Sequence, residues 1–77
     1  SPNPANHFFN ITIRSNNQEE KIGLRVVDVL GRVVENRGSV TEGKTFKIGE
    51  TYRPGIFFVE IVQGKERRII KLIKQSD

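Results

Sequence analysis

Hydrophobic and polar residues alternate along most of the chain, which is the pattern of half-buried β-strands. In His7–Arg14, for example, Phe9, Ile11 and Ile13 share one side and polar residues dominate the other. The strands expected from this pattern are 7–14, 22–30, 32–36, a short segment at Val40, 45–48, 56–62 and 67–74. About seven short strands without a convincing helix predict a small antiparallel β-sandwich.

Glycines and prolines mark the connections between these strands. Gly31 separates two valine-rich runs and predicts a hairpin, because glycine reaches positive φ without steric cost. Gly38 and Gly43 bracket a loop around Val40, and Pro54-Gly55 is a strong turn signal. A polar loop is expected at 15–21, where the sequence is SNNQEEK.

The final segment is ambiguous between strand and helix, since its apolar residues Ile69, Ile70, Leu72 and Ile73 also fit helical spacing. A strand is favoured because isoleucine is frequent here and because Gly64 suits a hairpin. The strand at 56–62 also needs a pairing partner.

Length limits what the domain can contain. Residues 1–6, with two prolines and two asparagines, are typical of a linker, and 7–77 form one domain. A chain of 77 residues buries only about 60% of its unfolded surface, so we expect a thin core and no deep substrate pocket. No stretch approaches the roughly 20 apolar residues of a membrane span.

Charge and cysteine content change this picture little. The net charge of +4 is compatible with nucleic acid, an anionic surface or an acidic partner. Because cysteine is absent, packing and strand pairing must hold the fold without disulfides.

Candidate chemistry is sparse. His7 is the only histidine and aspartate occurs only at positions 28 and 77, so a Ser-His-Asp triad is not expected. Glu19 and Glu20 are adjacent and would point to opposite sides of an extended chain. Metal-loop spacings are absent, and Tyr52 beside Arg53 is too little for a nucleic-acid stacking platform. We therefore expect no enzyme activity, cofactor, metal or nucleic-acid partner.

Three motifs together carry a family resemblance. PNPAN at the start, VVDVLGRVVE in the centre and PGIFFVEI leading into RRIIKLIK near the end resemble the type A C-terminal sorting domain of the Bacteroidetes type IX (Por) secretion system. The resemblance implies an immunoglobulin-like sandwich at the C-terminus of a large secreted protein. It also implies a parent that reaches the periplasm by a signal peptide and leaves through the outer-membrane translocon, to the cell surface or medium.

The resemblance assigns residues and partners. The matching positions are Asn3 and Pro4, Asp28 and Gly31 of D-x-x-G, Gly55, Phe57, where the family often has tyrosine, and Lys71 and Lys74 of K-L-x-K, with Gln75–Asp77 extending past the usual end. The implied partners are the translocon, a cell-surface sortase that removes the domain near its N-terminal boundary, and an upstream cargo domain. Association with the outer membrane would be indirect.

From these matches we expect Lys71, Leu72, Ile73 and Lys74 to be the strand that the translocon recognises, by strand addition and charge. Asp28, Gly31 and Gly55 would set the turns that present it; Asp28 can do so by accepting backbone N–H bonds, although direct contact with the translocon is an alternative. The basic strand could instead be an edge protected by charge against unwanted pairing. A generic immunoglobulin-like accessory or adhesion module remains the alternative function, followed by a basic nucleic-acid binder.

Overall fold

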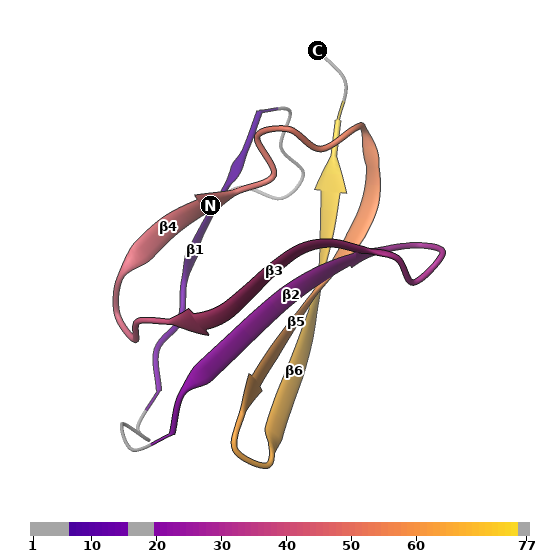
Figure 1. Ribbon diagram of the computed structural model, residues 1–77. Coiled ribbons are helices and arrows are strands. Elements are labelled where there is room, and N and C mark those ends of the chain that lie inside the picture. Colours follow the sequence, from indigo (N-terminus) through magenta and orange to yellow (C-terminus); the bar gives the residue numbers. More distant parts are fainter. Residues whose placement is uncertain (1–6, 16–19, 76–77) are drawn as a thin grey trace.

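The computed structural model describes residues 7–15 and 20–75, and every regular element in these ranges is a β-strand (Figure 1). The strands are β1 (Phe9–Thr12), β2 (Ile22–Asp28), β3 (Val33–Val40), β4 (Thr45–Ile48), β5 (Gly55–Gln63) and β6 (Glu66–Lys74). The final segment is a strand and not a helix, as the hairpin signal at Gly64 predicts. The expected linker at 1–6 and the centre of the polar loop at 16–19 lie outside the described residues.

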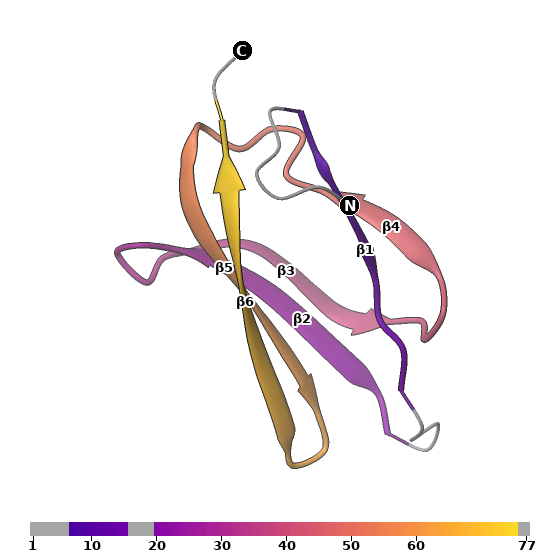
Figure 2. The ribbon, with the colours of Figure 1, turned by 180° about the vertical axis from the view of Figure 1, so that it is seen from behind.

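Two antiparallel sheets form the domain. A four-stranded sheet has the order β3-β2-β5-β6, and a two-stranded sheet pairs β1 with β4. The smaller sheet lies against one face of the larger one, and β1 is its strand nearer to β6 (Figures 1 and 2). The predicted small antiparallel β-sandwich is confirmed.

The strand count differs from the expected number at one place. The described chain has six strands because β3 runs without interruption from Val33 to Val40, through Gly38. Gly38 does not adopt a positive φ, but the β2–β3 register shifts beside it, since Ile22 pairs with Val40 and Leu24 with Arg37. The loop expected between Gly38 and Gly43 therefore begins later than predicted, because β3 continues through Gly38 to Val40.

The last hairpin is the longest pairing in the domain. All nine positions of β5 pair with β6, from Gly55 opposite Lys74 to Gln63 opposite Glu66. Gly64 and Lys65 form the two-residue connection, and Gly64 has the positive φ of 59° that such tight turns require at the first central position.

The core lies between the two sheets. Its fully buried apolar side chains come from both: Phe9 and Ile48 from the small sheet, and Leu24, Val26, Phe57, Val59 and Leu72 from the large one. Phe9 and Ile48 are cross-strand partners, so the small sheet covers the large one mainly through this pair. Phe9, which the alternation in 7–14 places on the apolar side, is buried, whereas Ile11 and Ile13 on the same side are partly buried and pack against the core.

This packing predicts unequal effects of truncating two adjacent phenylalanines. Phe9→Ala should lower the free energy of unfolding by about 3–5 kcal/mol, because it removes a large buried side chain at the contact between the sheets. Phe8→Ala is the matched control: Phe8 is only half-buried and lies under the ammonium of Lys47, so its loss should be less than half as large. Urea unfolding of both variants measures the difference, and equal losses would contradict the assigned core.

Candidate functional site

The final strand presents two different faces. Leu72 lies opposite the buried Phe57 and points into the core, whereas Lys71 lies opposite Phe58 on the outer face of the large sheet. Ile73 shares the outer face with Lys71 and is half-buried. The four residues expected to be recognised are therefore divided: Lys71 and Ile73 point outward, and Leu72 and Lys74 point inward.

Lys74 is buried, with 6% of its surface exposed. Its ammonium donates hydrogen bonds to the backbone carbonyl oxygens of His7 and Gly49. Burying an ammonium is costly unless its donors are satisfied, and these two carbonyls provide that compensation. Lys74 therefore ties the end of β6 to the start of β1 and to the loop after β4, three segments that lie together at one end of the domain in Figure 2.

Gly49 makes this arrangement possible. Its φ is +87°, and a Cβ atom there would lie 3.0 Å from a ring carbon of Phe9. A residue with a side chain would be strained at this φ and would crowd the core, so the backbone could not offer its carbonyl to Lys74 in the same way. In the sequence, Gly49 directly follows Ile48, the buried last residue of β4, and this position indicates a glycine with a structural role.

Asp28 organises the turn between β2 and β3. Its Oδ1 accepts the backbone N–H groups of Leu30 and Arg32, each at 2.9 Å, and its Oδ2 accepts Nε–H of Arg32 at 2.8 Å. Gly31 completes the turn with a φ of 82° and donates its N–H to the Asp28 carbonyl at 3.0 Å. The hydrogen bond to the Arg32 backbone is the main cause that holds the pKa of Asp28 below its usual value, because the bond favours the ionised carboxylate.

The motif residues, far apart in the sequence, meet in one cross-strand row. Asp28 lies opposite Phe57 on β5, and Phe57 lies opposite Leu72 on β6. The neighbouring pair Gly55 and Lys74 closes the same end of the sheet. The central turn, the glycine-aromatic strand and the basic C-terminal strand are thus parts of one structure, which their spacing in the sequence does not reveal.

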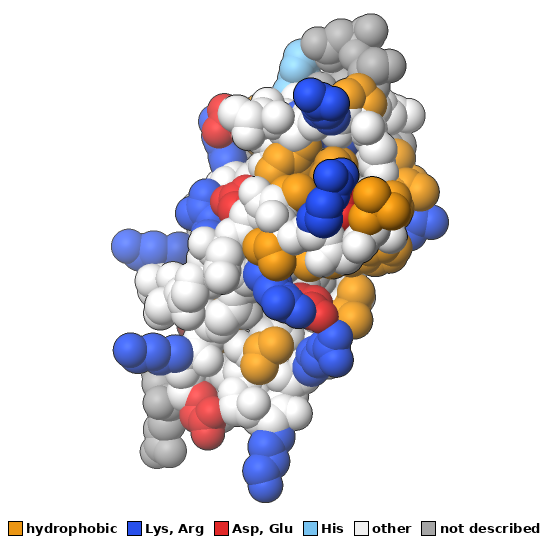
Figure 3. All heavy atoms as spheres, turned by 45° about the vertical axis from the view of Figure 1, so that its right-hand side comes forward, with side chains coloured by type: hydrophobic (Ala, Val, Ile, Leu, Met, Phe, Trp, Pro, Cys, Tyr) orange, Lys and Arg blue, Asp and Glu red, His pale blue; other side chains and the backbone are white. Residues whose placement is uncertain are grey.

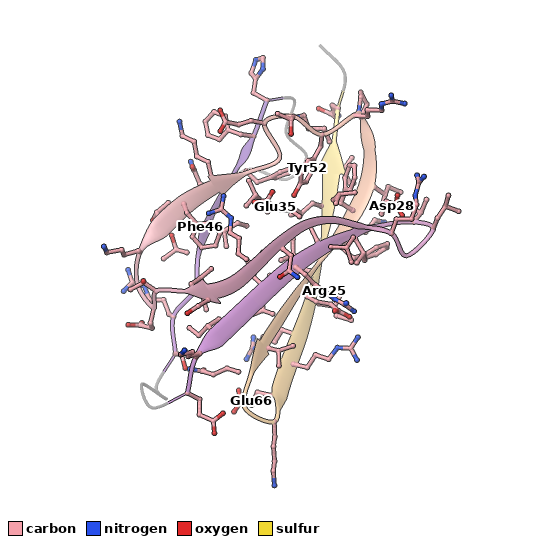
Figure 4. The ribbon with its side chains drawn as sticks, in the orientation of Figure 1. Arg25, Asp28, Glu35, Phe46, Tyr52 and Glu66 are labelled. Carbon is pink, nitrogen blue, oxygen red and sulfur yellow. The ribbon has the colours of Figure 1, made fainter. Side chains whose placement is uncertain are left out.

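Phe57 is buried and carries no hydroxyl, but a phenol lies beside it. The ring centroid of Tyr52 is 4.8 Å from that of Phe57, and the Tyr52 hydroxyl donates to Glu35 Oε1 at 2.7 Å (Figure 4). Burial, and then the Glu35 hydrogen bond, raise the pKa of Tyr52 well above its usual value. Tyr52 therefore packs as a structural link between β3 and the β4–β5 loop, a different role from a nucleic-acid stacking platform.

The outer face of the large sheet mixes apolar and charged side chains. Glu60 accepts hydrogen bonds from Arg25, at 2.5 Å, and from Arg67, which hold its pKa below the usual value. Beside this cluster Ile69 is 55% exposed, and Figure 3 shows hydrophobic and basic side chains interspersed over this side of the molecule. The face can therefore contact a partner through both apolar surface and charge.

Several residues considered in the sequence lie outside the described part of the chain. Asn3 and Pro4 lie outside the described residues, as do Glu19, Ser76 and Asp77. Within 7–15 and 20–75, no group of three or more His, Cys, Asp or Glu residues is placed to hold a metal ion. No helix in that part of the chain is long and apolar enough to span a membrane.

The described chain is thus a small β-sandwich whose motifs converge on a basic final strand. Residues 2–75 match the secretion system C-terminal sorting domain family, and the chain belongs to that family. It is therefore a C-terminal sorting signal of type IX secretion, which acts with that machinery to export a cargo to the cell surface or the extracellular space. No curated protein matches the chain.

We expect Lys74→Met to destabilise the domain far more than Lys71→Met. Methionine keeps the length of the side chain at position 74 but removes the donor, which leaves two inward-facing carbonyls without their partner and costs about 1–3 kcal/mol. Lys71 is exposed, so the same change there should cost less than about 1 kcal/mol. Urea unfolding of the two variants provides the comparison, and equal stability would show that the Lys74 contacts contribute nothing.

The lowered pKa of Asp28 predicts an acid dependence of stability. Because its folded-state pKa lies below the usual 3.8, the ionised carboxylate stabilises the fold above that pH and this contribution disappears as the pH falls through the folded value. Asp28→Asn, which cannot ionise, should reduce stability near neutral pH and flatten the loss between about pH 5 and pH 2. Urea midpoints across this range test it. The prediction fails if the stability of the wild-type domain and that of Asp28→Asn fall with the same slope as the pH is lowered. Glu60→Gln is the control variant, because Glu60 is the second carboxyl whose pKa is lowered.

Proposed function

We propose that the domain is a non-catalytic signal whose outward β6 residues, Ile69, Lys71 and Ile73, contact the type IX outer-membrane translocon. Two of these belong to the Lys71–Lys74 segment expected from the sequence. Leu72 and Lys74 would then act indirectly, by holding the strand in place from inside. Family membership supports a sorting role, and the division of β6 into two faces supports this separation of contact and supporting residues.

The position of β6 supports contact through the strand. It is the end strand of the large sheet in the order β3-β2-β5-β6. An edge strand can add to a partner strand through its backbone, while its side chains provide specificity. Lys71 supplies a positive charge next to the apolar Ile69, and charge complementarity raises the association rate and selects the partner.

The remaining steps follow from the resemblance. The upstream cargo would reach the periplasm by its own signal peptide and cross the outer membrane with this domain at its end. A cell-surface sortase would then cut within or before residues 1–6, because an extended proline-containing linker is accessible to a protease.

An export assay tests the recognition surface. The domain is fused to a fluorescent protein that carries a signal peptide and is expressed in a bacterium with the type IX system. Lys71→Glu should reduce surface and medium fluorescence at least about tenfold, since it reverses the charge on the outward face. Lys65→Glu, in the turn before β6, is the matched control and should export normally.

Two further measurements make the assay decisive. Urea unfolding must show that Lys71→Glu folds as stably as the control, so that lost export reports recognition and not misfolding. A fusion that ends before Arg68 lacks most of β6 and should remain in the periplasm. If Lys71→Glu is exported like the unaltered domain, the outward face of β6 is not the recognised surface.

A further inference from the structure

The inner face of β6 is incompletely covered. Ile70 lies opposite the fully buried Val59 and points to the same side as Leu72, yet 42% of its surface is exposed. The cause is the unequal size of the two sheets: the small sheet ends at β1, which lies on the side nearer to β6 (Figure 2). An inward-facing isoleucine that the domain itself does not cover indicates a place where another element can pack.

This place is a groove between β1 and the lower half of the large sheet. Its volume is about 560 Å³, and it is lined by the end of β1 and its continuation, by Ile61 and Gln63 of β5, and by 66–68 and Ile70 of β6. At one end of the groove, the Ser15 hydroxyl donates a hydrogen bond to Gln63 Oε1, and both residues belong to its lining.

The walls of the groove offer what a strand needs. β1 pairs with β4 on one side only, so its other edge pairs with no strand of the described residues, and its last residue, Thr12, lines the groove together with 13–15. Ile70 and Ile61 supply an apolar floor.

Charge specifies the occupant. Arg68 lies two residues before Ile70 on the same face, opposite Ile61, and it makes no ion pair with any described residue. Since side chains repeat every second residue along a strand, the occupant should place an apolar side chain over Ile70 and a carboxylate over Arg68. Residues 1–6 contain two prolines and no carboxylate and do not fit, and the net charge of +4 opposes a second copy.

We propose that this groove binds an extended strand of a second protein, with apolar and acidic side chains at alternate inward positions. The strand would extend the small sheet at β1 and complete the sandwich over Ile70 and Arg68. This site lies on the opposite face of β6 from the surface proposed to contact the translocon. The two proposals can therefore fail separately.

The test uses the whole 77-residue domain and a fluorescent peptide of about nine residues, enough to span the groove as a strand. In the probe, Val and Glu alternate on one face and Thr occupies the other. A second probe has Lys in place of each Glu. Fluorescence anisotropy should show saturable binding of the Glu probe, at least about tenfold tighter than that of the Lys probe, with the preference reduced by salt.

Neighbouring residues of β6 provide matched variants, because they point to opposite faces. Arg68→Glu and Ile70→Thr should each weaken binding of the Glu probe at least about fivefold. Lys71→Glu and Ile69→Thr, on the outer face, should change it less than about twofold. Urea unfolding verifies that each variant folds. If Ile70→Thr does not fold, Arg68→Glu by itself still tests the proposal.

Three results would overturn the proposal. The first is the absence of saturable binding of the Glu probe. The second is that the inner-face and outer-face variants weaken binding of the Glu probe equally. The third is self-association of the domain, seen by sedimentation and abolished by Arg68→Glu, which would assign the groove to a second copy. The proposal is supported if the domain is monomeric and Arg68→Glu weakens binding of the Glu probe while the outer-face variants do not.

Discussion

A sheet of two strands has to cover a sheet of four in this domain, and most of its other features follow from that inequality. The small sheet can seal only part of the large one, so it concentrates its coverage in the cross-strand pair of Phe9 and Ile48. The inner face of β6 is open at Ile70 and is covered again at Leu72 and Lys74. The thin core of a short chain is thus distributed unevenly, and the uneven part coincides with the strand on which sorting is proposed to depend.

Lys74 shows how a charged residue can hold such a structure together. Its ammonium spans from the last strand to the carbonyls of His7 and Gly49, so the two ends of the folded chain are fixed to each other. This contact fixes the final strand to the rest of the domain. The row formed by Asp28, Phe57 and Leu72 serves the same end, because it joins the central turn to that strand through β5.

The opposite faces of β6 have different chemical character, and this separates two kinds of contact. The outer face combines exposed apolar surface with Lys71 and the Glu60 cluster. The inner face offers Ile70 and Arg68 beside the edge of β1. One strand can therefore serve two partners without competition between them, provided that both bind the folded domain.

Alternation by itself determined that the chain is a β-sandwich, because a strand with one buried face must place its apolar residues at every second position. The motif around Gly31 also placed Asp28 at the turn where it accepts backbone hydrogen bonds. Alternation could not show that β3 continues through Gly38, since that depends on the pairing of β3 with β2, whose register shifts there. Nor could it tell which inward residues are covered: the burial of Lys74 and the exposure of Ile70 depend on where the small sheet ends. Only tertiary structure decides that, because coverage is a property of two sheets packed together and not of one strand.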